Sequence, residues 1–123
     1  MSKKIKQFVA VAWTVALTAG FAAAHEEHGT TQTVTGEVVD LACYLGHGAS
    51  GPKHRDCAQK CISSGLPVGI KAGDTLYLAV GSEHDPVNAK LAPLAAKQVV
   101  AEGKVTEQDG VHLIAIQKVT VKE

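Results

Sequence analysis

Apolar and polar residues alternate over the last third of the chain, and this period of two is typical of half-buried β-strands. Residues 98–106 and 111–121 are the two strands expected there. Between them, Gln108, Asp109 and Gly110 are residues that favour a tight turn. The pattern therefore predicts a long antiparallel hairpin.

Three earlier segments have the same strand character. Residues 33–41 carry β-branched side chains in near alternation, and Gly36 within them indicates a bend or bulge. Residues 66–71 and 75–80 are two further expected strands, joined by a short turn that contains Gly73. Five strands are expected in total.

Glycine and proline divide the remaining chain into a loop and two helices. The glycine-rich residues 42–51 predict a loop. Pro52 suits the first turn of a helix and Gly65 suits its end, so a short helix is expected over residues 53–63. A second helix is expected to be capped by Asp85 and opened by Pro86, and to end near Lys97. Its apolar residues at helical spacing are Val87, Leu91, Leu94 and Ala95.

This order of elements predicts a mainly β fold, a small five-stranded barrel with one or two short helices. The order, together with the phrases VTGEV (residues 34–38) and VAEGKV (residues 100–105), resembles the oligonucleotide/oligosaccharide-binding (OB) barrel, particularly its small bacterial periplasmic members. The resemblance covers about residues 33–121 and implies architecture alone. The segment 41–65, with three cysteines, is an insertion that departs from the plain periplasmic members. We expect one domain over residues 33–123.

The beginning of the chain has the pattern of a secretory signal peptide. Basic residues at Lys3, Lys4 and Lys6 precede an apolar run over residues 8–19, and cleavage is expected after Ala24. The same run could also stay uncut as an anchor. Residues 1–24 are the expected signal peptide and 25–32 a flexible lead-in. The mature protein is therefore expected in the periplasm or secreted, with no stable membrane insertion after cleavage.

Cleavage changes the charge and removes most aromatic residues. The mature chain keeps nine Lys and Arg against 12 Asp and Glu, a net charge of about −3. Tyr44 and Tyr77 are its only aromatic residues apart from histidine. Nucleic-acid binding needs a positive surface and stacking platforms, so we expect no nucleic-acid partner.

Five potential metal ligands lie within the expected insertion. Cys43 and His47 precede a second group, His54, Cys57 and Cys61, whose spacing of i, i+3 and i+7 places it on one helical face. Thiolate and imidazole are the donors that zinc and copper sites use. The Cys57-x-x-x-Cys61 spacing also resembles that of copper chaperones and of the binuclear copper domain of oxidases.

The same cysteines allow two other interpretations. A disulfide from Cys43 to Cys57 or Cys61 would stabilise a small exported domain, whereas Cys57 and Cys61 lie too far apart on a regular helix to pair with each other. The odd thiol would then be structural, or would cross-link a dimer. Thiol redox chemistry is the remaining alternative and requires an exposed thiol of lowered pKa.

Cleavage after Ala24 would make His25 the first residue of the mature chain. Its amine and imidazole together form a chelate, and His28 offers a further nitrogen. Copper(II) favours such nitrogen donors. His25 is therefore an additional candidate copper ligand.

The sequence has no complete catalytic signature, so no enzymatic activity is expected. The leading hypothesis is an exported metal-binding protein that takes a copper or zinc ion, copper before zinc, through its Cys/His cluster. The alternative is a non-catalytic structural or ligand-binding barrel stapled by a disulfide.

Overall fold

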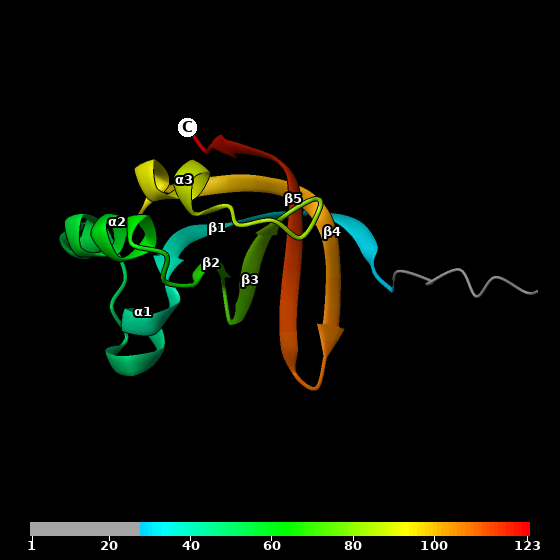
Figure 1. Ribbon diagram of the computed structural model, residues 1–123, viewed down its shortest axis with the longest axis horizontal. Coiled ribbons are helices and arrows are strands. Elements are labelled where there is room, and N and C mark those ends of the chain that lie inside the picture. The colour runs from blue at the N-terminus through cyan, green and yellow to red at the C-terminus, as the bar shows by residue number, and fades with distance from the viewer. Residues whose placement is uncertain (1–27) are drawn as a thin grey trace, which may run out of the picture.

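Five β-strands form a closed barrel in the computed structural model, which describes residues 28–123 (Figure 1). The elements in chain order are β1 (Thr30–Asp40), α1 (Leu41–His47), η1 (Pro52–His54), α2 (Arg55–Ser63), β2 (Val68–Ala72), β3 (Thr75–Gly81), α3 (Asn88–Leu91), η2 (Ala92–Leu94), β4 (Gln98–Gln108) and β5 (Val111–Val121). The strand order around the barrel is β1-β2-β3-β5-β4, which confirms the predicted mainly β, five-stranded barrel.

The barrel closes because β1 pairs with two neighbours. Its first part pairs with β4 and its last part with β2, and Glu37 lies opposite both Gln98 and Lys71. Gly36 stands just before this change of partner, where an added Cβ would lie 2.3 Å from the backbone oxygen of Lys71. The bend predicted at Gly36 thus falls where two strands approach too closely for any side chain. β1 begins at Thr30, three residues before the expected start.

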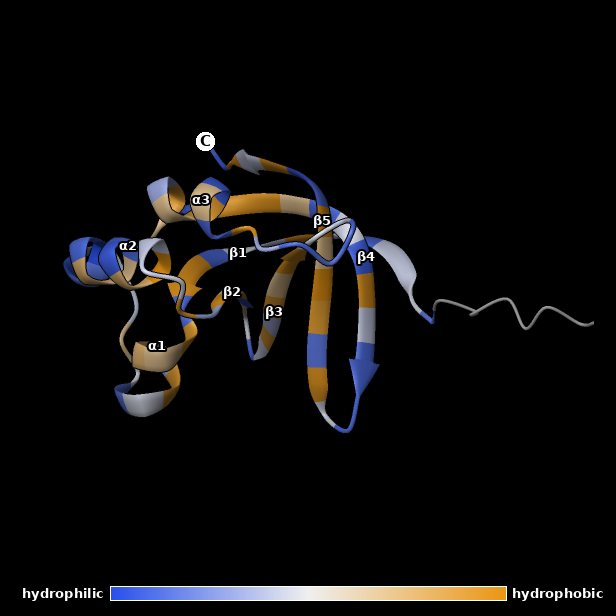
Figure 2. Ribbon diagram, viewed as in Figure 1, coloured by the Kyte–Doolittle hydropathy of each residue, from blue (hydrophilic) through white to orange (hydrophobic). Residues whose placement is uncertain are grey.

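The β4–β5 hairpin is the longest pairing of the barrel and confirms the C-terminal prediction. The strands meet through a turn at Asp109 and Gly110, both at positive φ. Alternating hydrophilic and hydrophobic bands along β5 are visible in Figure 2. A register shift between Glu102 and Gly103 bends β4. The parallel pairing of β3 with β5 completes the ring of strands that closes the barrel.

The core fills the barrel and continues under the helices at one end. Ile62 of α2 and Leu91 of α3 are fully buried there, and Ala58 joins them from α2. The core residues are Val34, Val38, Ala58, Ile62, Val68, Ile70, Ala79, Val87, Leu91, Ala92, Ala95, Val99, Ala101, Val105, Ile114 and Ile116. Burial of this apolar face fixes α2 against the barrel.

The loop predicted over residues 42–51 is wrong in its first half, which forms α1. The Asp40 carboxylate caps this helix, and Gly48 ends it at φ 69°. The cap residues at the two ends therefore define a helix, although the glycines of this segment favoured a loop in the sequence-based prediction.

The second predicted helix is shorter than expected. Its capping residue is Val87 instead of Asp85, and no side chain caps it. Pro93 cannot donate a backbone hydrogen bond, and the last turn is the 3₁₀ segment η2. The first helix, by contrast, is confirmed as η1 followed by α2.

The expected signal peptide, residues 1–24, and the candidate ligand His25 lie outside the described residues. Among residues 28–123, no helix combines the length and the hydrophobicity needed to cross a bilayer.

Candidate metal centre

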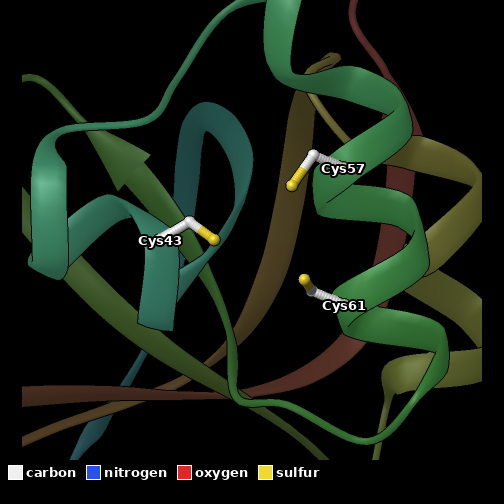
Figure 3. Close-up of side chains that lie close together, drawn as sticks. All are labelled: Cys43, Cys57 and Cys61. Carbon is white, nitrogen blue, oxygen red and sulfur yellow. The ribbon is translucent and has the colours of Figure 1, made fainter.

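Three cysteine sulfurs gather between α1 and α2. Cys43 extends from α1, and Cys57 and Cys61 extend from successive turns of α2 toward it (Figure 3). The three Sγ atoms all lie within 4.8 Å of one another. In the described part of the chain this is the one group of three or more such side chains compact enough to hold a metal ion.

Asp40 orients the helix that carries Cys43. Its side chain accepts hydrogen bonds from the backbone N–H groups of Ala42, at 3.4 Å, and Cys43, at 2.9 Å. The backbone N–H of Leu41 donates to the carbonyl of Pro67 at 2.9 Å, which ties the start of α1 to the segment that leads into β2. Cys43 is therefore held by the end of a barrel strand as well as by its own helix.

Core packing orients the helix that carries the other two thiols. Ala58 and Ile62 point into the barrel, and Cys57 and Cys61 each precede one of them by a single residue. One residue is a rotation of about 100° on a helix, so the thiols lie beside the buried face instead of within it. Cys57 is exposed and Cys61 is partly buried, which leaves the cluster open on the side of Cys57.

Side-chain hydrogen bonds attach the rest of this segment to the barrel. The backbone N–H of Gly51 donates to the Glu37 carboxylate on β1. The side-chain amide of Asn88 donates to the carbonyls of Ile62, at 2.9 Å, and Leu66, at 2.7 Å. These bonds position both ends of the η1–α2 segment relative to Cys43.

The separation of the sulfurs is close to that of a three-thiolate site. A metal–sulfur distance of about 2.3 Å places trigonal thiolates roughly 4.0 Å apart and tetrahedral ones roughly 3.8 Å apart. The three Sγ atoms, all within 4.8 Å of one another, are therefore close enough that they could hold one ion.

The disulfide expected between Cys43 and a cysteine of α2 is not formed. All three cysteines are free. Cys57 is exposed, and Cys43 and Cys61 are only partly buried, so none of the three is a fully buried core residue.

Two thiols of the cluster have raised pKa values. A hydrogen bond with the Asp40 carboxylate, reinforced by desolvation, raises the pKa of Cys43 to about 12 from an ordinary 9.0. Desolvation, together with the negative charge of Asp40, raises the pKa of Cys61. These shifts are opposite to the lowered pKa that activates catalytic cysteines. Metal ions would have to displace these protons, as they do in thiolate sites generally.

The raised pKa of Cys43 predicts a specific loss of stability at high pH. Folding favours the protonated thiol, so its contribution is fully present below pH 9.0 and is lost as the pH rises toward 12. We expect the unfolding free energy of the metal-free protein to fall more steeply across this window than that of Cys43→Ser. Denaturant titrations with reductant and chelator at several pH values measure both slopes, and parallel slopes would contradict the prediction.

The predicted histidine ligands do not belong to the compact group. His47 ends α1 and His54 ends η1; both are exposed, and neither joins the three sulfurs within 4.8 Å. Asp40 caps α1, and its carboxylate also raises the pKa of the Cys43 thiol, an effect that the sequence analysis did not identify. The position of an acidic residue three residues before Cys43 is the sequence signal that was available.

Comparison with protein-family models, curated proteins and solved structures finds no match to this chain.

Proposed function

We propose that this is an exported metal-binding protein that holds one copper(I) ion between α1 and α2. Cys43, Cys57 and Cys61 are the ligands. The convergence of three free thiols from two separately anchored helices is the observation that supports the proposal. No catalytic role is assigned to the site.

The donor set favours copper(I) over zinc. Thiolates are soft ligands that select copper(I), and three of them complete a trigonal site without a further residue. Structural zinc sites are almost always four-coordinate. Among residues 28–123 the compact group consists of three sulfurs without a fourth side chain, which makes zinc the second candidate.

The proposed setting is the periplasm or the exterior of the cell. The signal-peptide pattern in residues 1–24 supports export. The strand order β1-β2-β3-β5-β4 supports a relation to the OB-like barrels of small periplasmic proteins. The cysteine-bearing segment would then be the addition that distinguishes this protein from plain members of that group.

Elemental analysis combined with intact mass tests the proposal directly. The mature protein is purified without tags or chelators from a periplasm supplied with copper. We expect about one copper per chain, with all three thiols released for alkylation after the metal is removed under denaturing conditions. A metal-free chain lighter by two hydrogens would instead identify a disulfide staple, and one zinc per chain in the presence of copper would reverse the order of the metals.

A further inference from the structure

Two lysines lie close in sequence to the most accessible thiol of the cluster. Lys60 follows Cys57 by three residues on α2, and Lys53 belongs to η1, the 3₁₀ turn that leads into α2; both are exposed. Asp56, the one acidic residue among residues 41–65, precedes Lys60 by four residues, and Arg55 adds a third positive charge. We call Lys53, Lys60 and Cys57 the basic thiol patch.

This charge is opposite in sign to the remainder of the domain. Residues 41–65 carry Lys53, Arg55 and Lys60 against Asp56, a net charge of +2. The other described residues carry six lysines against nine acidic residues, a net charge of −3. In Figure 2, α2 is mostly hydrophilic, apart from the side that faces the barrel. The segment that carries the candidate metal site is therefore positive, whereas the remainder of the described domain is negative.

We infer that the basic thiol patch is the docking surface for an acidic protein that exchanges copper(I) with this chain through a thiol of its own. The inference rests on the proposed function. Complementary charge accelerates encounter and orients the partners, and it concentrates the acidic partner at Cys57. A protein partner is favoured over a lipid surface because the positive segment carries an exposed metal ligand, which only a partner with its own ligand can use.

The exchange is a substitution of ligands without a change of oxidation state. The partner's thiol loses its proton and binds the copper(I) ion, and the bond from copper to Cys57 breaks. The Cys57 sulfur takes up a proton, and the metal remains copper(I) throughout. Cys57 is the expected leaving ligand because it is the exposed member of the three.

Two peptides with the same pair of cysteines, one flanked by glutamates and the other by lysines, provide the test. Copper(I) transfer from the loaded full-length mature protein is followed by stopped flow. At low ionic strength we expect the acidic peptide to accept copper at least about tenfold faster than the basic one. The difference should disappear at high salt because screening weakens the attraction.

Charge-reversal variants locate the effect. The double variant Lys53→Glu/Lys60→Glu should reverse the preference for the acidic peptide, whereas the matched control Lys118→Glu/Lys122→Glu, which changes two exposed lysines of β5 and the C-terminal end, should keep it. Equal rates for both peptides would overturn the inference. So would a control variant that loses the preference for the acidic peptide as fully as Lys53→Glu/Lys60→Glu does. Cosedimentation with anionic lipid vesicles that depends on Lys53 and Lys60, without any peptide preference, would also overturn it in favour of a membrane.

Copper stoichiometry is measured on every preparation before transfer begins. Failure of the wild-type protein to hold copper would contradict the proposed function itself. Normal loading with transfer that is indifferent to charge would contradict only the docking surface.

Discussion

The double substitution Cys57→Ser and Cys61→Ser is expected to abolish stoichiometric copper(I) binding. It removes two of the three sulfurs that lie within 4.8 Å of one another, and the hydroxyl that replaces each is a poor ligand for a soft ion. A competition titration against a copper(I) chelator measures the affinity. Cys43→Ser should also lose tight binding, although its ligand comes from the other helix.

The exposed histidines supply the matched controls for this experiment. His47→Ala and His54→Ala remove residues that the sequence predicted as ligands but that lie outside the compact group. Both variants should keep stoichiometric binding, with affinity within about tenfold of the wild type. Loss of binding in either one would mean that an imidazole completes the site and would revise the proposed ligand set. Retained binding in the double cysteine variant would remove the thiol cluster as the copper site.

The second large effect concerns the barrel. Gly36→Ala is expected to lower the free energy of unfolding by about 3 kcal/mol, because the new Cβ would lie 2.3 Å from the Lys71 oxygen, which is part of the backbone. For a domain of this size, that loss corresponds to a fall in melting temperature of roughly 12–24 °C. Thermal unfolding of the metal-free protein under reducing conditions measures it.

Gly46→Ala is the matched control for the barrel substitution. Gly46 lies in α1, and an added Cβ there would meet nothing within 4 Å. Alanine in a helix is favoured over glycine by about 0.5–1 kcal/mol, so this variant should be slightly more stable than the wild type. If Gly36→Ala and Gly46→Ala unfolded at the same temperature, the close approach of β1 and β2 would not be the constraint that we describe.

Strand periodicity made most of the barrel predictable. Burial alternates along β4, as expected for a strand with one buried face, and the turn at Asp109 and Gly110 joins β4 to β5. Along β5 the alternation is interrupted, because Ile114, Ala115 and Ile116 are all buried. Gly36 was recognisable as an irregularity. The close approach that requires a glycine there was not predictable, since the Lys71 carbonyl comes from another strand.

The candidate site was predictable only in part. Helical spacing correctly placed Cys57 and Cys61 on one side of α2, since that relation is local. The contribution of Cys43 depended on α1, which three glycines in residues 42–51 concealed although Asp40 and Gly48 mark its two ends. The density of ligands along the sequence also predicted His47 and His54, but neither belongs to the compact group, because neighbours in sequence do not necessarily point to the same place in the fold.

The segment that carries the three cysteines, residues 41–67, begins and ends at one residue pair of the sheet, where Asp40 of β1 lies opposite Val68 of β2. Residues 41–67 therefore form one continuous module that takes the place of a short hairpin turn between β1 and β2. The module also closes the barrel, because Ala58 and Ile62 fill the core at that end. A redesign that keeps Asp40, Ala58 and Ile62 could therefore replace the three cysteines of the candidate site without altering a strand.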